Sequence, residues 1–507
     1  MHMTMRGFGR TALLGALLTA TAPIAAASAD EGVFRLGITT DAQSLDPIAT
    51  SDNASIWAQL LIFDQLIRPT KDGTGLEPGL AESWTVNDAG TEYVFKLREA
   101  TFSDGTPVTA DDVIASLTRA QGEGSNWQRF FKPITRMEKV DDRTVKLGLD
   151  KPFTPLVNNL AMFSASILPA KALEAQGAAF FENPIGSGPF KLANWERGGR
   201  MVLEANPHYW QSGKPSVKQA ELIVVGEDNS RVLQLRAGDI DAMIDVPLNQ
   251  MQSLDGTDGI TTKTADVYRV DFVQLNTREE PFGDQKVRQA LNYAVDKEGI
   301  VKGVLFGTAT PAVSSMPVMR YHNDALAPYA YDPEKAKALL AESGLADGFQ
   351  SSMLVGAGDT TAQQVAAAIQ ANLRDVGVDV DLQLIESGAQ WDTTKGGKYQ
   401  MSLSYATSDT VDPDQLIGFT AVNPERANAY HTEWKSERLN ELYDQERQTV
   451  DGPERGAMFT EMEQIVHDGA PCIFLYNPGA TYAYRDNVEG FEVLPTSNWR
   501  LEDVVLK

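Results

Sequence analysis

The side chains that most often perform catalysis are few and scattered in this chain. Beyond residue 29 it has one cysteine, Cys472, and four histidines, His208, His322, His431 and His467. A catalytic thiol needs a histidine in a polar setting. Cys472 instead lies in the apolar run 470–476 (APCIFLY), which predicts a buried strand and an inert thiol. A single cysteine also excludes a disulfide within the chain.

The short motifs of common enzyme and metal sites are absent. The sequence has no H-E-x-x-H, C-x-x-C or G-x-S-x-G, and no phosphate-binding GxxxxGK[ST]. Residues 186–189 (GSGP) come nearest to a glycine-rich loop, but Pro189 lacks an N–H donor, so the segment predicts a tight bend. Paired carboxylates are so common here that counting them leaves glycosidase chemistry open.

Helices and strands alternate along the chain. Asp332 is a predicted N-cap, Pro333 starts a helix and Gly344 ends it. A second helix is predicted over residues 362–376, between strands at 351–355 and 378–384. Strand, helix and strand in this order form a βαβ unit, which implies parallel pairing.

The N-terminal third shows the same mixture. Residues 93–97 alternate as a strand, residues 103–107 (SDGTP) form a turn, and Thr109 is a predicted N-cap for a helix over residues 110–119. A chain of 507 residues exceeds what one core supports. The prediction is therefore a mixed α/β protein of at least two lobes.

The start of the chain and its charge indicate where the protein works. Arg6 and Arg10, an apolar run and residues 27–29 (ASA) match a secretory signal peptide over residues 1–29. No cysteine lies near that cleavage point, so we expect an exported soluble protein that is not lipid-anchored. The formal net charge of −25 disfavours nucleic acid as a partner.

A series of motifs then resembles solute-binding protein family 5, the extracytoplasmic peptide- and nickel-binding components of ABC importers. The series covers essentially the whole chain after residue 29, in the family's order. Its segments are 80–84 (LAESW), 93–98 (YVFKLR), 102–113 (FSDGTPVTADDV), 183–190 (NPIGSGPF), 206–210 (NPHYW), 281–284 (PFGD), 287–296 (VRQALNYAVD), 331–336 (YDPEKA) and 412–414 (DPD).

The resemblance implies a two-lobed α/β periplasmic-binding-protein-like fold with mixed sheets, which closes on a ligand by hinge rotation. The expected first lobe is discontinuous, with residues 30–64, 185–267 and 478–507. Residues 65–184 would form an extra subdomain of that lobe, and residues 272–477 the second lobe. The motif segments around Trp84 and Asp104 are expected to hold the extra subdomain together.

The resemblance also points to a ligand contact at Asp409. In peptide-binding members an aspartate a few residues before Asp-Pro pairs with the ligand's α-ammonium group, and Asp409 stands at that position in 405–414 (YATSDTVDPD). Tyr405, Thr407 and Ser408 belong to the same candidate site, and the strand over 400–405 would offer backbone groups to an extended peptide. The alternative is that Asp409 only caps a turn.

Further candidates come from other segments. By the same resemblance, Trp127 and Arg129 would overhang the cleft from the extra subdomain, where they could stack on a ligand or meet its carboxylate, or else be a loop anchor and a solvated charge. Ser51 and Asn53 could line the first lobe's side or cap a helix near residue 54. His431 could approach the ligand. No metal and no cofactor is expected.

Two departures narrow the expected ligand. Ala406 replaces a tryptophan that peptide-binding members usually carry, and residues 356–359 (GAGD) lack the arginine with which dipeptide-binding members hold a carboxylate. We therefore expect a non-enzymatic, monomeric periplasmic protein that delivers peptides, oligopeptides more than strict dipeptides, to an ABC permease. Alternatives are an opine, chelated-nickel or oligosaccharide binder, a sensor or chaperone on the same fold, or an exported hydrolase.

Overall fold

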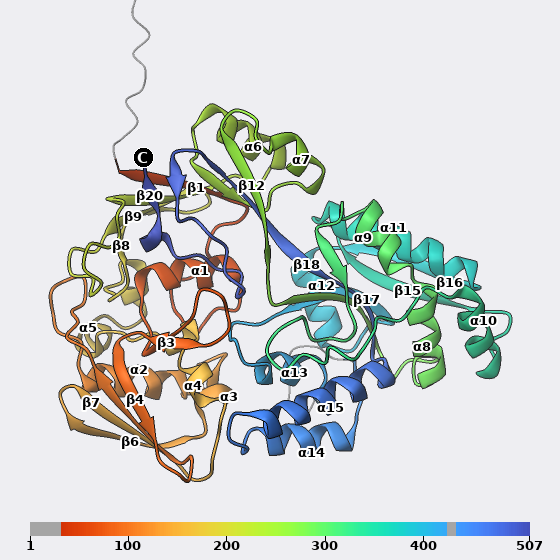
Figure 1. The fold of residues 1–507 in the computed structure, drawn as a ribbon, viewed down its shortest axis with the longest axis horizontal. Helices are drawn as coiled ribbons and strands as arrows, with labels where there is room; N and C mark the ends of the chain where they lie inside the picture. The colour runs from red at the N-terminus through yellow and green to blue at the C-terminus, as the bar shows by residue number, and fades with distance from the viewer. Residues whose placement is uncertain (1–31, 423–431) are drawn as a thin grey trace, which may run out of the picture.

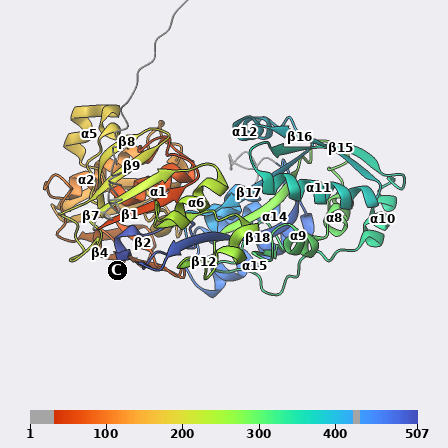
Figure 2. The same ribbon diagram turned by 90° about the horizontal axis from the view of Figure 1, so that it is seen from above.

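The computed structural model describes residues 32–422 and 432–507, in two lobes that lie side by side (Figure 1, Figure 2). The predicted signal peptide and His431 fall outside these residues. Within the described residues, no helix is both long and apolar enough to cross a lipid bilayer.

The first lobe is built on a mixed sheet in the order β11-β1-β10-β9-β8. Strand β1 pairs in parallel with β10 and β11, and β9 pairs antiparallel with β10 and β8. Helix α1 packs on this sheet and shares its apolar core. The elements are β1 (Val33–Ile38), α1 (Asn53–Ile62), β8 (Phe190–Glu196), β9 (Arg200–Ala205), β10 (Gln219–Val224), α6 (Asp228–Ala237), β11 (Ala242–Ile244), α7 (Met251–Leu254), β12 (Ile260–Asp266), β19 (Val488–Glu489) and β20 (Val505–Leu506).

A separate antiparallel sheet, in the order β4-β5-β7-β6, forms the lower left of Figure 1. Helix α2 packs against this sheet. The sheet and the helix share an apolar core that is distinct from the core of the first-lobe sheet. The elements here are β2 (Ile67–Pro69), β3 (Leu76–Pro78), β4 (Ala81–Val86), β5 (Glu92–Leu97), α2 (Ala110–Ala120), α3 (Gln128–Phe131), β6 (Ile134–Asp141), β7 (Thr144–Leu149), α4 (Leu156–Asn159) and α5 (Ala170–Gln176).

The second lobe has a sheet in the order β16-β15-β17-β13-β18 with helices on both faces. Along β13, Val273 and Leu275 enter one core while Val270 and Phe272 enter the other, as the period of two in a strand requires. The elements are β13 (Arg269–Leu275), α8 (Gln285–Ala294), α9 (Lys297–Gly303), β14 (Ala309–Pro311), α10 (Pro333–Glu342), β15 (Phe349–Gly356), α11 (Thr360–Asp375), β16 (Val378–Ile385), α12 (Ser387–Lys395), β17 (Met401–Thr407), α13 (Asp414–Thr420), α14 (Glu437–Glu446), α15 (Pro453–Gly469) and β18 (Cys472–Arg485).

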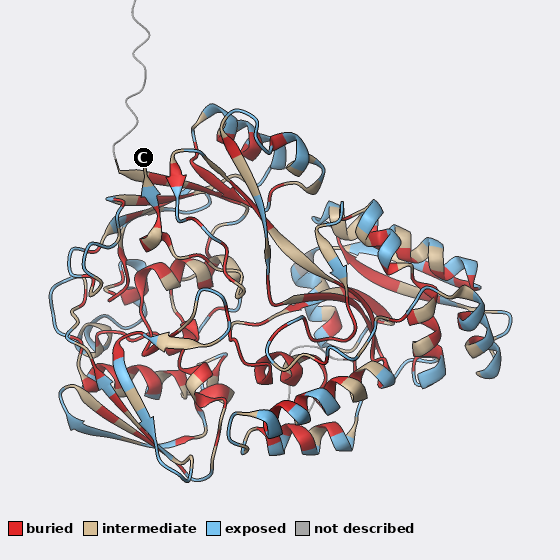
Figure 3. Ribbon diagram, in the orientation of Figure 1, coloured by how far each residue is buried: buried red, intermediate tan, exposed pale blue. Residues whose placement is uncertain are grey.

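Strand β18 belongs to both lobes. Its first half pairs with β13, and its second half, from Gly479 to Arg485, pairs with β12 and β11. Figure 1 shows β12 and β18 running side by side between the lobes. The large sheet is therefore continuous, and its strand β13 is buried over most of its length (Figure 3).

Most local predictions are confirmed. Asp332 caps α10 by accepting from Lys335 N, Thr109 caps α2 in a capping box with Asp112, and β15 pairs in parallel with β16 around α11. Two elements begin two residues earlier than predicted: β15 at Phe349, and α11 at Thr360, where the Asp359 carboxylate accepts from Ala362 N at 2.8 Å and caps the helix.

The predictions for the bend at residues 186–189 and for the buried thiol of Cys472 also agree with the structure. Residues 186–189 do form a bend, and it lies tight against the end of α1, where Gly188 N donates to Ile62 O at 2.9 Å. A Cβ on Gly186 would lie 1.9 Å from Ile62 O, so only glycine fits. Cys472 opens the buried strand β18, and burial raises the pKa of its thiol, as an inert cysteine requires.

Candidate functional site

A pocket of about 650 Å³, counting its opening to solvent, lies where the two lobes meet. Most of its wall comes from the first lobe: helix α1, the segment after it and the C-terminal tail, which is blue in Figure 1. From the second lobe, Asp409 lines the pocket. The other lining residues are Ile56, Trp57, Leu60, Asp64, Gln65, Arg68, Pro69, Ala161, Phe163, Pro189, Leu494, Thr496, Asn498, Trp499, Arg500 and Glu502.

Asp409 follows strand β17 and is held by the start of α13. Gln415 Nε2 donates to Asp409 Oδ2 at 2.9 Å, and Asp409 N donates to Gln415 Oε1 at 2.7 Å. Among the described residues no cation forms an ion pair with this half-buried carboxylate. Burial raises the pKa of Asp409 to about 6, against the lowering effect of the hydrogen bond from Gln415. Such a carboxylate is stabilised if a ligand supplies a positive charge.

The residues just before Asp409 have different surroundings. Tyr405 is 46% exposed, and the Arg269 guanidinium lies 4.1 Å from the centre of its ring. Thr407 is half-buried opposite Arg269 in the β17–β13 ladder. Ser408 is buried, with its hydroxyl 2.9 Å from Thr410 O and 3.0 Å from Gln415 Oε1. The Ser408 hydroxyl thus holds the loop that presents Asp409.

Trp127 and Arg129 lie near this region but do not line the pocket. Trp127 is buried and donates from Nε1 to Thr50 O at 2.8 Å, which anchors its loop. The Arg129 guanidinium stacks at 4.1 Å on Phe419 of α13, in the second lobe. Arg129 thus lies where the extra subdomain meets the second lobe, whereas the hydrogen bond of Trp127 stays within the first lobe.

Ser51 and Asn53 flank the residue that caps α1. Asp52 is the N-cap and accepts from Ser55 N at 2.8 Å. Ser51 is exposed, Asn53 is the first residue of the helix, and neither lines the pocket. His431 lies outside the described residues.

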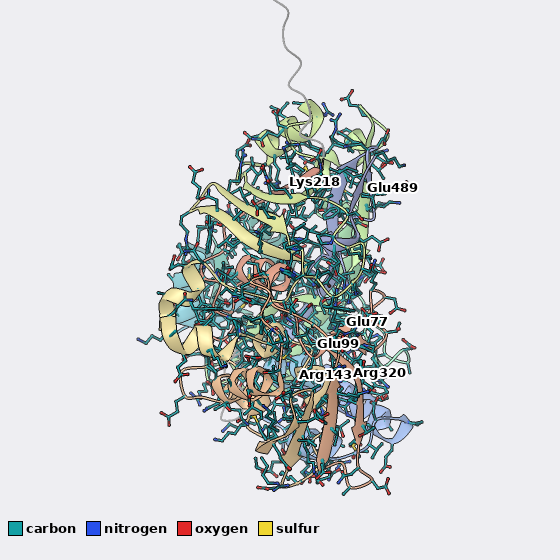
Figure 4. All side chains as sticks on the ribbon, turned by 90° about the vertical axis from the view of Figure 1, so that its left-hand side faces the viewer. Glu77, Glu99, Arg143, Lys218, Arg320 and Glu489 are labelled. Carbon is teal, nitrogen blue, oxygen red and sulfur yellow. The ribbon has the colours of Figure 1, made fainter. Side chains whose placement is uncertain are left out.

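None of the residues that form the first-lobe wall of the pocket was predicted from the sequence. Arg68 pairs with Glu502, and Arg500 donates to Glu77 Oε1 at 2.7 Å; Glu77 is labelled in Figure 4. Trp57 and Trp499 lie with ring centres 4.8 Å apart. The partners are more than 400 residues apart, so no local pattern could join them. The one sequence feature that could have indicated this wall is the tryptophan followed directly by an arginine, Trp499 and Arg500, since both line the pocket.

A second charged group lines the same wall. Burial raises the pKa of Asp64 to about 6, against the charge of Arg68 nearby, and Trp210 Nε1 donates to its Oδ2 at 2.8 Å. Over residues 32–422 and 432–507, no cluster of three or more His, Cys, Asp or Glu side chains is placed to hold a metal ion.

The sheet order, the strand shared between the lobes and the pocket between them define a two-lobed periplasmic-binding-protein fold. The chain belongs to the bacterial extracellular solute-binding proteins, family 5, since the model of the family's middle region matches residues 75–425.

Similar proteins and solved structures span the chain. It is 28% identical to the probable D,D-dipeptide-binding periplasmic protein DdpA of Escherichia coli K12, over 96% of both chains. It is also 28% identical to the glutathione-binding protein GsiB of the same strain, over 92% of both. Helicobacter pylori DppA, solved with the peptide STSA, has a TM-score of 0.83 at 27% identity, over 94% of this chain and 98% of that one. The agropinic acid complex of AgaA from A. tumefaciens R10 has a TM-score of 0.83 at 28% identity, over 94% and 99%.

Proposed function

We propose that this protein is the periplasmic solute-binding component of an ABC importer and that it captures peptides for delivery to a membrane permease. The observation that carries the proposal is the half-buried Asp409 carboxylate in an interlobe pocket, without an ion-pair partner among the described residues. Two relatives named as D,D-dipeptide-binding and glutathione-binding, and a similar structure solved with the peptide STSA, support the same class of ligand. No step of this function requires catalysis.

Asp409 would accept hydrogen bonds from the ligand's α-ammonium group. A buried carboxylate is costly without a counter-charge, and an arriving ammonium group supplies one. Because Asp409 comes from one lobe and the rest of the wall from the other, a ligand that contacts both favours the closed form over the open one.

Strand β17 supports an extended ligand. It pairs with β13 along its whole length, but with β15 only at Met401 and Ser402. Toward β15, residues 404–407 have no strand partner among the described residues. That edge ends next to Asp409, so a peptide held by its ammonium group could continue as an added strand.

The two departures from the family pattern favour ligands longer than a dipeptide. Ala406 is buried in the second-lobe core and does not line the pocket, so this position offers a ligand no aromatic ring. Residues 356–359 supply no arginine, and Asp359 in that stretch caps α11 instead. Residues 356–359 therefore offer no arginine that could bind a ligand's carboxylate.

An opine is the second candidate, since AgaA was solved with agropinic acid. For either ligand we propose that residues 30–64, 185–267 and 478–507, with the extra subdomain 65–184, move against residues 272–477. The hinge would lie where the chain crosses between the lobes, at residues 266–269 and 477–479. We further propose export by the segment 1–29 and a monomeric state.

Native mass spectrometry of the protein purified from its own host tests the proposal. We expect an adduct with peptide-like fragments in the wild type and its loss in Asp409→Asn. Asp52→Asn, which changes a helix cap outside the pocket, serves as the control and should retain the adduct. An opine adduct would replace the peptide assignment, and an adduct that survives in Asp409→Asn would remove the role of that carboxylate.

A further inference from the structure

The positive charges on the first-lobe wall are already matched. Arg68 pairs with Glu502 and donates to the Tyr209 hydroxyl at 3.0 Å. Arg500 donates to Glu77 and to the carbonyl of Pro69. Among the described lining residues, no guanidinium or ammonium group is left without a carboxylate.

The same wall has an unmatched neutral donor. Trp499 is 3% exposed and lines the pocket, and its indole Nε1 has no hydrogen-bond partner among the described residues. Three other indoles are satisfied: Trp127 donates to Thr50 O, Trp195 to Asp41 and Trp210 to Asp64. A donor sealed from water without a partner is destabilising. An acceptor on a molecule that fills the pocket would relieve that cost.

We propose that the pocket selects a monocationic ligand, with an amine at Asp409 and an uncharged carbonyl acceptor at the Trp499 N–H. This inference rests on the proposed function and specifies the ligand's second end. A carboxylate placed against this wall would lose its hydration without gaining a free cation, and it would face the carboxylates of Glu502 and Asp64. A neutral amide carbonyl gains the hydrogen bond without that repulsion. The paired rings of Trp57 and Trp499 then cover the apolar part of the ligand.

Isothermal titration calorimetry with two matched peptides tests this inference. The probes are tri-alanine with a C-terminal carboxamide and tri-alanine with a free carboxylate, at pH 7.5. We expect the carboxamide to bind at least about tenfold more tightly, which corresponds to one lost hydrogen bond or one uncompensated charge. Trp499→Phe keeps a ring but removes the N–H, and should weaken carboxamide binding by about tenfold.

Trp195→Phe is the matched control, because its indole donates to Asp41 and does not line the pocket. It should bind the carboxamide as the wild type does, and an unchanged melting temperature should show that both variants fold. Equal or tighter binding of the free acid, or unchanged binding in Trp499→Phe, would overturn the inference and leave the proposed function intact. Failure of the wild type to bind either peptide would instead reject the peptide function, and the inference with it.

Discussion

Two of the places where the lobes meet differ in how their polar groups are paired. One is the pocket around Asp409. The other, here called the outer seam, joins Thr154 and Asn158 of the first lobe to Asp412 and residues 447–449 of the second. Thr154 donates from its N and its Oγ1 to the carbonyls of Arg447 and Thr449, both at 2.7 Å, and Asn158 Nδ2 donates to Asp412 Oδ2 at 3.1 Å.

Behind the outer seam every charge has an opposite charge. Arg455 is fully buried and binds Asp412 with both terminal nitrogens, at 2.6 and 2.8 Å, and Glu446 at 2.7 Å. Asp414 pairs with Arg447; burial alone would raise the pKa of Asp414, but the charge and hydrogen bond of Arg447 lower it. These charges are paired without any ligand, although Glu446 Oε1 and Asn158 Oδ1 have no hydrogen-bond partner among the described residues.

The pocket is incomplete by comparison. Asp409 has only an amide as its partner, and the Trp499 N–H has none among the described residues. Asp409 and Asp412 are three residues apart on one loop, yet one is matched and the other is not. Asp409 is therefore the carboxylate of this loop that is available to a ligand, while the ion pair of Asp412 with Arg455 holds the loop in place.

The largest expected effect comes from breaking the matched network. Arg455→Met removes the charge between Asp412 and Glu446 while keeping a similar length, and should lower the free energy of unfolding by about 3–5 kcal/mol, because buried carboxylates are left uncompensated. Urea denaturation measures the change.

A surface pair is the control for that variant. Arg143 and Glu99, both labelled in Figure 4, form an exposed ion pair at 3.0 Å. Arg143→Met should change the free energy of unfolding by less than about 1 kcal/mol. If Arg455→Met and Arg143→Met lower the free energy of unfolding equally, the buried ion pairs of Arg455 stabilise the fold no more than an exposed ion pair does, and the contrast is wrong.

The pH dependence of binding sharpens the other side of the comparison. Without ligand the pKa of Asp409 is raised to about 6, and a bound ammonium group would lower it. Affinity for tri-alanine carboxamide should thus be full above pH 6 and fall by up to about tenfold per pH unit below it. Calorimetry between pH 4.5 and 7.5 measures this.

Asp64 lines the same wall and its pKa is also raised to about 6, so it must be tested beside Asp409. Asp409→Asn should remove the acid limb of the profile, whereas Asp64→Asn should retain it. If the acid limb disappears in Asp64→Asn and persists in Asp409→Asn, the titrating group is Asp64 of the first lobe. That result would contradict the role of Asp409 in binding the ligand's ammonium group.

The smallest effect is expected at the outer seam itself. Asn158→Ala removes one hydrogen bond between the lobes, while Asp412 keeps its bonds to Arg455, so ligand affinity should fall about fivefold. The change should lie in the dissociation rate, as measured by surface plasmon resonance, because the bond exists only when the lobes touch. Asn229→Ala, at the exposed start of α6, should bind like the wild type.

Sequence reasoning succeeded where the cause is local. Asp332 caps α10 through a bond to a backbone three residues away, and Gly344 ends that helix with a positive φ of 78°, so both signals lie within one turn. The parallel pairing of β15 and β16 followed from one βαβ unit. The family motifs then supplied the fold.

The site was predicted only in part. The sequence indicated Asp409, which does line the pocket, but it did not reveal that the Ser408 hydroxyl turns inward toward Gln415. It also missed Trp499 and the Arg68–Glu502 pair, whose members are 434 residues apart. Such contacts depend on how the C-terminal tail returns to α1, which no local spacing encodes.

A thermal-shift comparison of Asp409→Asn with Asp412→Asn tests the central claim most directly. The melting temperature of each is measured at pH 7.5 with and without saturating tri-alanine carboxamide. Asp409 has a raised pKa in the folded protein, so its ionised form is a cost at pH 7.5 that asparagine lacks. We predict that Asp409→Asn melts no lower than the wild type and loses the ligand-induced shift.

Asp412→Asn should do the reverse: melt lower by about 5 °C, because it weakens the buried contact to Arg455, and retain the ligand-induced shift. A retained shift in Asp409→Asn, together with a lost shift in Asp412→Asn, would contradict the assignment of the unmatched carboxylate to the ligand.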